Sequence, residues 1–383
     1  MHFVSLTDHT PGEHRVALTP NAAARLVDLG ATVRLEAGYG GRSFFDDASY
    51  RDAGVDFAPR ETLLREADVL LTLNPPDPDD LAMMPEGATV IGLMDPFRRT
   101  DVVRALVARK LAGICMELIP RSTYAQKMDV LSSQASLAGY AAVLRAAERI
   151  DKSFPMMSTP AGTIAPARVF VIGVGVAGLQ AIATAKRLGA RVDAYDTRPV
   201  VAEQVRSLGA KFVELDVGET GETEQGYAKE LTPEQLEMQR QQMARVVAEA
   251  DVVITTAQLF GRPAPRIVSA EMVAGMRPGS VVVDLAAGSG GNVEGSRPDE
   301  EVLTEEGIRI VGATNLPSSV ARDAGQMFAN NMVHLITHAW DAESGRMTLD
   351  PEEDPVVGAC LLTQAGEVRD ERVSKVLAEE DES

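Results

Sequence analysis

Three glycines with the spacing Gly-x-Gly-x-x-Gly are the residues best suited to chemistry in this chain: Gly173, Gly175 and Gly178. In such a turn the first glycine permits a tight bend, and the second lets the backbone approach a pyrophosphate without a Cβ in the way. The third lets the following helix pack closely against the preceding strand, and the N–H groups that open this helix face the phosphates. The spacing therefore predicts a dinucleotide-binding turn. The alternative is a strand-to-helix turn that binds nothing.

Two charged residues downstream bear on which dinucleotide would bind. Asp196 follows Gly178 by 18 residues, close to the spacing of an acid that accepts hydrogen bonds from the adenosine ribose. A carboxylate at that point repels a 2′-phosphate, which favours NAD(H) over NADP(H). Arg198 weakens this preference, because an arginine can accommodate the 2′-phosphate.

A second polar cluster lies in a predicted loop before a long helix: Arg121, Gln126, Asp129 and Ser132. Loops at the carboxyl ends of parallel strands face the ligand crevice, so these side chains could face the nucleotide across an interdomain groove. An arginine binds pyrophosphate with two hydrogen bonds, and glutamine and aspartate bind a carboxamide or a ribose. The alternative is a polar helix start, in which Asp129 caps the first turn and Arg121 is a surface charge. The spacing alone favours neither.

The elements that would position these residues alternate between short apolar strands and helices. This βαβ rhythm predicts an α/β protein with two Rossmann-like, doubly wound parallel-sheet domains and an interdomain cleft. A helix predicted over residues 326–340 returns the chain to the first domain. We therefore expect an N-terminal α/β domain of residues 1–133 plus 320–383, and a dinucleotide-binding Rossmann domain of residues 134–319.

The composition argues against several classes of function. The net charge of −19 disfavours binding to nucleic acid and direct adhesion to an anionic bilayer. The 2 cysteines form no Cys-x-x-Cys and no Cys/His cluster with zinc spacing, so we expect no metal site. Neither a signal peptide nor an apolar run of about 20 residues is evident, and we expect a soluble, cytoplasmic protein.

Several stretches resemble a known family. Residues 10–20 (TPGEHRVALTP) and 173–189 look like signatures shared by alanine dehydrogenases and transhydrogenases. The loop of residues 121–132 and the segment 226–230 (GYAKE) resemble the transhydrogenase pattern specifically. Over nearly its whole length the chain is similar to the soluble NAD(H)-binding alpha subunit of proton-translocating NAD(P) transhydrogenase, and more distantly to alanine dehydrogenase.

The resemblance implies a function and an assembly. NADH held in the cleft would pass a hydride directly to NADP⁺ bound on a separate NADP(H)-binding component, in the Re/Si-specific reaction. A membrane-spanning subunit would couple this transfer to proton translocation. The chain would form a homodimer and lie on the cytoplasmic face of the inner membrane through its partner subunits.

The resemblance also implies roles for individual residues. Gln126 and Asp129 would act at the nicotinamide as the catalytic residues, with Arg121 and Ser132 beside them. Val176, Asp196 and Arg198 would hold the adenosine half. Gly226 and Tyr227 would lie on a mobile loop that closes over bound NAD(H).

Departures from the alanine dehydrogenases help to discriminate. Those enzymes carry a substrate-binding lysine in the segment matching residues 69–76 and a catalytic histidine in the segment matching residues 90–96, and neither is present here. Oxidation of an amine needs a proton-transfer group, whereas hydride transfer between two nicotinamides needs alignment and exclusion of water. Arg15, which could bind a substrate carboxylate, remains. An amino-acid dehydrogenase of the alanine type and a non-catalytic NAD(H)-binding module therefore stay as alternatives.

Overall fold

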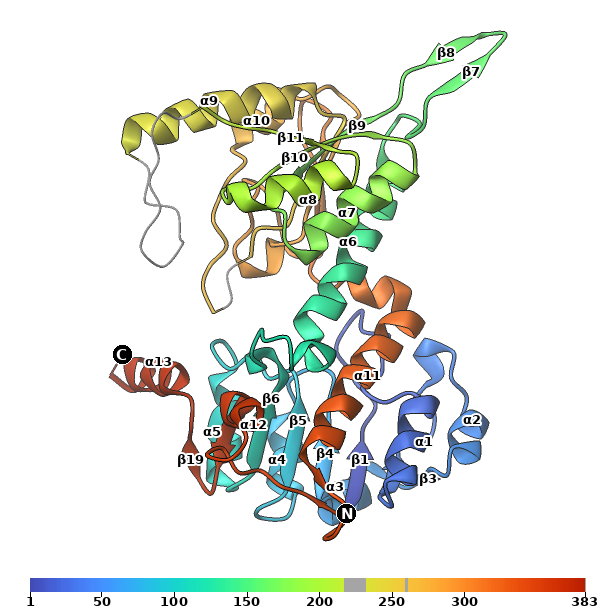
Figure 1. Ribbon diagram of the computed structural model, residues 1–383, viewed down its shortest axis with the longest axis vertical. Coiled ribbons are helices and arrows are strands. Elements are labelled where there is room, and N and C mark those ends of the chain that lie inside the picture. The colour runs from blue at the N-terminus through green and yellow to red at the C-terminus, as the bar shows by residue number, and fades with distance from the viewer. Residues whose placement is uncertain (217–231, 259–260, 383) are drawn as a thin grey trace. The chain divides into compact units, whose positions relative to one another are not determined.

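The computed structural model describes residues 1–216, 232–258 and 261–382, and the chain divides into two compact units (Figure 1). Unit 1 comprises Met1–Gln134 and Ser318–Ser383, and unit 2 comprises Ala135–Pro317. Each unit is built on a largely parallel sheet with helices packed against it. The predicted α/β class with two Rossmann-like domains is confirmed.

The sheet of unit 1 has eight strands in the order β19-β18-β6-β5-β4-β1-β2-β3. The six parallel strands are β1 (His2–Ser5), β2 (Thr32–Leu35), β3 (Asp56–Phe57), β4 (Val69–Leu71), β5 (Thr89–Gly92) and β6 (Ala112–Cys115). Two antiparallel strands complete one edge, β18 (Leu361–Gln364) on β6 and β19 (Glu367–Val368) on β18. The central strands β4, β5 and β6 are buried at every residue, as expected of a sheet covered on both faces.

Helices from both ends of the sequence cover this sheet: α1 (Pro20–Asp28), α2 (Asp47–Asp52), α3 (Arg60–Glu66), α4 (Pro78–Met83), α5 (Thr100–Ala108), α11 (Ala321–Ala339), α12 (Pro355–Cys360) and α13 (Glu371–Glu382). Helix α11 buries Phe328, Met332 and Ile336 in the same hydrophobic core as strands β1 and β4. The C-terminal segment is therefore an integral part of unit 1.

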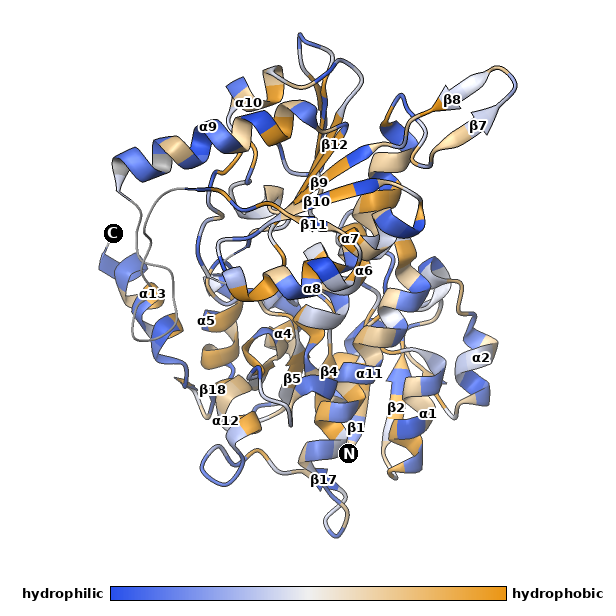
Figure 2. Cartoon of the chain, turned by 45° about the horizontal axis from the view of Figure 1, so that its top comes forward, coloured by the Kyte–Doolittle hydropathy of each residue, from blue (hydrophilic) through white to orange (hydrophobic). Residues whose placement is uncertain are grey.

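The sheet of unit 2 has the order β11-β10-β9-β12-β13-β15-β14. Its parallel strands are β9 (Arg168–Ile172), β10 (Arg191–Tyr195), β11 (Lys211–Phe212), β12 (Val252–Thr255), β13 (Val281–Asp284) and β15 (Arg309–Gly312), and β14 (Glu301–Leu303) is antiparallel to β15. Figure 2 shows hydrophobic residues concentrated along β9 and β12. The helices are α7 (Val176–Arg187), α8 (Ala202–Ser207), α9 (Pro233–Glu249), α10 (Ala270–Ala274) and most of α6 (Val130–Arg149), which begins in unit 1.

A two-stranded hairpin extends away from the rest of unit 2 (Figure 1). It consists of β7 (Met157–Thr159) and β8 (Gly162–Ile164), and all six of these strand residues are exposed. A smaller antiparallel pair, β16 (Trp340–Asp341) and β17 (Arg346–Met347), follows α11 in unit 1. Within the described ranges, none of the helices is both long and apolar enough to span a membrane.

Candidate dinucleotide site

The glycine turn of unit 2 connects β9 directly to α7. Gly173 has a φ of +94°, in the left-handed region that favours glycine, and its N–H donates to the Tyr195 carbonyl at 2.9 Å. A Cβ on Gly178 would lie 1.9 Å from the carbonyl oxygen of Gly173, so the helix can start this close to the strand only with glycine there. A Cβ on Gly175, the residue that precedes α7, would have no protein atom within 4 Å. The space in front of Gly175 is open, as a phosphate-binding turn requires.

The turn lies where the strand order of the sheet reverses. The chain passes from β9 through α7 to β10 on one side of β9, and later returns to β12 on the other side. Thr256, which follows β12, donates from its hydroxyl to the Gly173 carbonyl at 2.9 Å and joins the two strand ends. In open α/β sheets ligands bind outside the carboxyl ends of the strands at such a switch point.

The carboxylate of Asp196 is held at the end of β10 by four hydrogen bonds. Oδ2 accepts from the Val174 N–H at 2.7 Å and from Arg198 Nη2 at 3.0 Å, and Oδ1 accepts from the Arg198 N–H and Nε, both at 2.9 Å. Burial alone raises the pKa of Asp196, but these bonds outweigh burial and hold the pKa below its ordinary value. The structure thus brings Asp196 and Arg198 together beside the turn, with Asp196 ionised.

Two apolar side chains that lie close in sequence to Val174 and Arg198, the two residues bonded to Asp196, are exposed. Val176, the first residue of α7, is 43% exposed, and Val200, two residues after Arg198, is 80% exposed. Exposed aliphatic groups beside a polar anchor are suited to the face of a base. Val200 was not singled out from the sequence, because a valine after a proline carries no signal of its own.

The polar loop of unit 1 is partly tied to itself. Asp129 follows the short 3₁₀ helix η3 (Gln126–Met128), and its carboxylate accepts from the Ser132 N–H at 2.9 Å and from the Ser132 hydroxyl at 2.6 Å. The capping role considered for Asp129 is therefore present at the start of α6. Arg121 and Gln126 are exposed. Gly226 and Tyr227, the predicted lid residues, lie outside the described residues.

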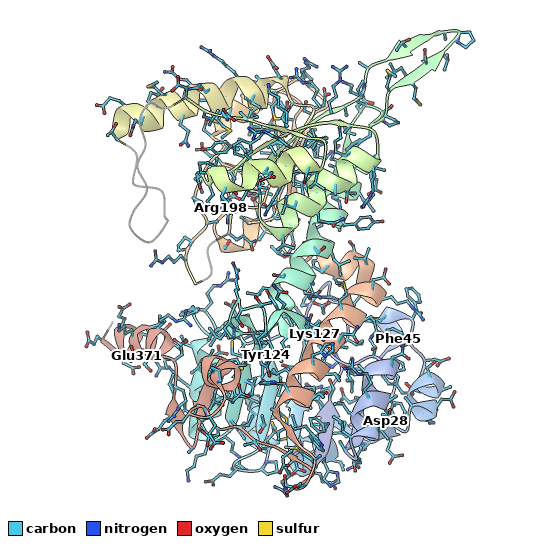
Figure 3. The ribbon with its side chains drawn as sticks, viewed as in Figure 1. Asp28, Phe45, Tyr124, Lys127, Arg198 and Glu371 are labelled. Carbon is cyan, nitrogen blue, oxygen red and sulfur yellow. The ribbon has the colours of Figure 1, made fainter. Side chains whose placement is uncertain are left out.

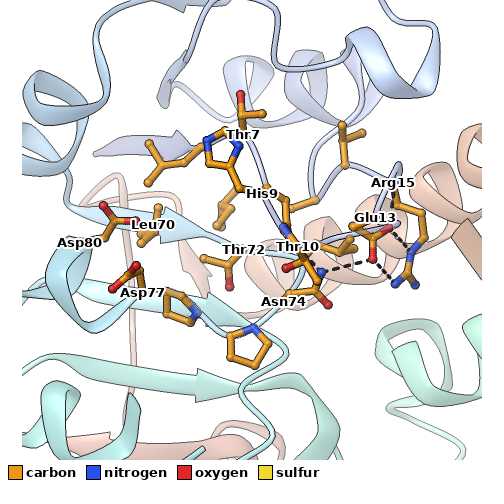
Figure 4. A pocket seen from close by; sticks show the side chains of 18 of the residues that line it. Thr7, His9, Thr10, Glu13, Arg15, Leu70, Thr72, Asn74, Asp77 and Asp80 are labelled. Carbon is orange, nitrogen blue, oxygen red and sulfur yellow. Dashed lines mark hydrogen bonds and ion pairs between the residues drawn. The ribbon is translucent and has the colours of Figure 1, made fainter. Parts of the chain in front are cut away.

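A cavity of about 370 Å³ lies within unit 1 (Figure 4). It is lined by residues that follow β1 and β4, at the carboxyl ends of these adjacent strands. The strand order also reverses here, because the chain visits β2 and β3 on one side of β1 before it crosses to β4 on the other. The cavity thus occupies in unit 1 the topological place that the glycine turn occupies in unit 2.

An ion pair between Glu13 and Arg15 forms one wall of the cavity. Arg15 Nε and Nη2 donate to the two oxygens of Glu13 at 2.9 and 2.7 Å, and Nη1 donates to Gln134 Oε1 at 2.8 Å. Asn74 Nδ2 donates to Glu13 Oε2 at 3.2 Å and to Asp8 Oδ2 at 2.9 Å. Burial alone raises the pKa of Glu13, but the bonds from Arg15 and Asn74 lower it to about 2. The guanidinium of Arg15 therefore already holds a carboxylate from its own chain.

The cavity lacks the lysine expected of an alanine dehydrogenase, but it does contain histidine side chains. Thr72 and Asn74 line the cavity from the segment in which alanine dehydrogenases carry their lysine. Two imidazoles, those of His9 and His14, also line it. Both histidines lie outside residues 90–96, the segment in which the resemblance to alanine dehydrogenases would place a catalytic histidine.

Comparison with known proteins places the chain in a family. The family "Alanine dehydrogenase/PNT, N-terminal domain" matches residues 6–138, and "Alanine dehydrogenase/PNT, C-terminal domain" matches residues 142–371. The chain belongs to the alanine dehydrogenase/PNT family. It is 43% identical to the first part of the NAD(P) transhydrogenase subunit alpha of Rhodospirillum rubrum, over 92% of this chain and 94% of that protein. It is 27% identical to an alanine dehydrogenase of Mycolicibacterium smegmatis, over 97% and 95% of the two chains.

A solved structure gives the same relationship within the alanine dehydrogenase/PNT family. "The crystal structure of transhydrogenase from Sinorhizobium meliloti" superposes with a TM-score of 0.85 and 42% identity, over 96% of this chain and 99% of that chain. The resemblance to transhydrogenase alpha subunits, with alanine dehydrogenase as the more distant relative, is therefore confirmed.

Proposed function

We propose that this chain is the NAD(H)-binding component of a proton-translocating NAD(P)⁺ transhydrogenase. The observation that carries the proposal is the glycine turn at the switch point of unit 2, with Asp196 at the end of the neighbouring strand. The 43% identity to a transhydrogenase alpha subunit supports the choice of reaction. In that reaction NADH supplies a hydride to NADP⁺ on another component, and proton movement through a membrane subunit is coupled to the transfer.

In this proposal the residues of the chain bind the dinucleotide and orient its nicotinamide. The N–H groups that open α7 face the pyrophosphate, and the open space at Gly175 admits it. Asp196, Arg198 and Val176 hold the adenosine half. Gly226 and Tyr227, which lie outside the described residues, are proposed to bind the cofactor as well. Gln126 and Asp129 contact the nicotinamide, beside Arg121 and Ser132. A hydride passes directly between two nicotinamides only when they are aligned and water is excluded, so these contacts are the chain's contribution to the rate.

The proposed preference for NAD(H) rests on the charge at Asp196. The ionised carboxylate is buried and faces the turn, where a 2′-phosphate would meet it. Arg198 neutralises part of this charge from an exposed position. NADP(H) accordingly belongs to the partner component.

The proposed assembly has three partners. A second copy of the chain forms a homodimer, an NADP(H)-binding component receives the hydride, and a membrane-spanning subunit moves protons. The chain would be cytoplasmic and peripheral, on the cytoplasmic face of the inner membrane through these subunits.

The experiment that tests this function combines three assays of the purified chain. We expect NADH to bind to the isolated chain in a fluorescence titration. We expect hydride transfer to NADP⁺ only after an NADP(H)-binding transhydrogenase component is added, followed by absorbance with an NADP⁺ analogue of shifted spectrum. The third assay, the oxidation of L-alanine with NAD⁺, should give no NADH.

The outcomes separate the alternatives. Alanine-dependent NADH formation by the isolated chain would assign an amino-acid dehydrogenase and point to His9 or His14 as the proton-transfer group. Binding of NADH without transfer in the mixture would leave a non-catalytic module. The closed Glu13–Arg15 pair favours the absence of alanine activity, because a substrate carboxylate would have to displace Glu13.

A further inference from the structure

Helix α11 reaches the polar loop of unit 1 with two side chains that are seven residues apart, and therefore on one face of the helix. Asn331 is buried, donates from Nδ2 to the Lys127 carbonyl at 2.8 Å, and accepts from the Ser133 hydroxyl at 2.7 Å. His338 contacts Tyr124, with Nδ1 at 3.4 Å from the phenol oxygen and the rings edge to face at 5.4 Å. Figure 3 labels Tyr124 and Lys127 on the loop beside α11.

The imidazole of His338 is fixed from its other side by Asp354. Nε2 lies 2.6 Å from Asp354 Oδ2, and the same residue accepts the N–H groups of Val356 and Val357 that open α12. The contact is close but lacks the alignment of a hydrogen bond, because Nε2 has no hydrogen-bond partner among the described residues. At the opposite edge of the ring, Nδ1 faces the phenol of Tyr124. Asp354, His338 and Tyr124 thus form a chain from α12 through α11 to the loop.

Ala125 and Met128 anchor one side of the loop in the core of unit 1, but the stretch that precedes Ala125 lies at the surface. Residues 121–124 are all exposed, and the side chain of Tyr124 is 69% exposed. The two contacts from α11 fall at Tyr124 and Lys127, one on each side of Gln126. They hold the backbone on both sides of the residue proposed to touch the nicotinamide.

We propose that Asn331 and the Tyr124–His338–Asp354 chain are positioning residues, which fix the loop so that Gln126 and Asp129 meet the nicotinamide already aligned. This inference rests on the proposed function for its effect on hydride transfer. The four residues act through Gln126 and Asp129 and do not touch the cofactor. A displacement of about 1 Å in such alignment lowers a transfer rate strongly. We call these four residues the clamp, and we expect it to contribute to the rate of hydride transfer more than to the affinity for NADH.

The test uses two single variants, their double variant and one control variant, with two readouts. Tyr124→Phe removes only the exposed phenol oxygen, and His338→Phe keeps the ring while it removes both nitrogen contacts. The matched control is Asn330→Ala, one residue from Asn331, where the side chain meets Arg25 and Gln326 and not the loop. The first readout is hydrogen exchange of the amides of residues 121–129 in the chain without nucleotide. The second is kcat for hydride transfer with the NADP(H)-binding component, measured beside the Kd of NADH.

We expect Tyr124→Phe and His338→Phe each to speed exchange in residues 121–129 by about two- to tenfold, the range of one net hydrogen bond. Both should lower kcat by a similar factor with the Kd of NADH little changed. The double variant should be no worse than His338→Phe, because Tyr124→Phe removes a contact that His338→Phe has already lost. Asn330→Ala should match the wild type in both readouts.

A negative result for the clamp can be told apart from a negative result for the proposed function. Unchanged exchange in Tyr124→Phe and His338→Phe would overturn the clamp, whatever the nucleotide does. Faster exchange with unchanged kcat would overturn its role in alignment. If the wild-type chain bound no NADH, the proposed function would fail, while the exchange experiment would still judge the clamp.

Discussion

Arg15 lies in the N-terminal signature that the chain shares with its relatives, yet its guanidinium is already paired. Glu13 binds it with both oxygens, and the Glu13 side chain is completely buried. The sequence left the role of Arg15 open, because two charged residues at this spacing fit either a ligand site or an internal ion pair. Another partner of Arg15, Gln134, lies 119 residues away and could not be predicted.

The first prediction concerns the acid stability of this pair. The folded-state pKa of Glu13 is about 2 against an ordinary 4.5, so the pair stabilises the fold above pH 4.5 and loses its effect as the pH falls toward 2. A shift of this size corresponds to about 3 kcal/mol. Glu13→Gln should lower the free energy of unfolding by roughly this amount at pH 7, and the difference from the wild type should narrow below pH 4, as followed by urea denaturation.

A surface pair provides the control for that prediction. Glu86→Gln removes the exposed partner of Lys110 and should change stability little at any pH. A constant difference between wild type and Glu13→Gln from pH 7 to pH 3 would show that the pair does not titrate as described.

The second prediction concerns the choice between NADH and NADPH at Asp196. Asp196→Ala removes the acceptor for the ribose, so NADH should bind about tenfold or more weakly, while NADPH loses less because the repulsion of its phosphate also disappears. Arg198→Ala removes the compensating charge and should sharpen discrimination against NADPH. The measurement is the ratio of the two Kd values. The same ratio in both variants as in the wild type would give Asp196 a purely structural role.

At the scale of elements, the glycine turn of unit 2 contains a glycine that the fold requires and one that it does not. Gly178 is needed by the fold, because a Cβ there would meet the Gly173 carbonyl at 1.9 Å. Gly139 on α6 is similar, with a Cβ position 2.1 Å from the Ala177 carbonyl at the start of α7. Gly175 has open space before it and a φ of −85°, which any residue adopts. The fold therefore does not require glycine at this position.

The third prediction contrasts these glycines directly. Gly175→Ala should keep the melting temperature of the wild type and bind NADH more weakly, because the methyl group fills the space for the pyrophosphate. Gly178→Ala should lower the melting temperature clearly, since backbone must shift to admit the methyl group. Thermal denaturation and NADH titration of the two proteins check this. Equal NADH affinity in Gly175→Ala and the wild type would remove the pyrophosphate from this turn.

The central strands were predictable because they are short apolar runs that the sheet buries on both faces. The run of valine and isoleucine at residues 252–255 is one such strand, β12, and α7 begins at Val176 directly after the glycine turn, where the dinucleotide-binding pattern places a helix. Strand β18 was not predicted. It pairs with β6, about 250 residues earlier, and such a long-range pairing leaves no local pattern. The contacts of Asn331 and His338 with the loop escaped prediction for the same reason.

At the scale of the whole molecule, the hairpin of unit 2 supports the proposed homodimer. An isolated two-stranded hairpin is marginally stable in water, and this one exposes Met156 (64%), Met157 (44%) and Ile164 (46%). Apolar side chains on a projecting hairpin of this kind are stabilised when a second chain covers them.

The fourth prediction follows from that exposure. Replacement of Met156, Met157 and Ile164 together by serine should shift the protein from dimer toward monomer in sedimentation equilibrium, without loss of the fold. Leu303→Ser is the control, because Leu303 is 64% exposed on β14, outside the hairpin. A triple variant as dimeric as the wild type would place the interface elsewhere.

The discontinuity of unit 1 has a consequence for the order of events on the ribosome. Every strand described in unit 2 has been made once residue 312 is synthesised, so this unit can close its sheet while the C-terminal segment is still in the exit tunnel. Unit 1 needs the buried residues of α11, β18 and Val373 to complete its core. The half of the protein that is translated first is therefore the half that finishes folding last, the reverse of the usual N-terminal-first order.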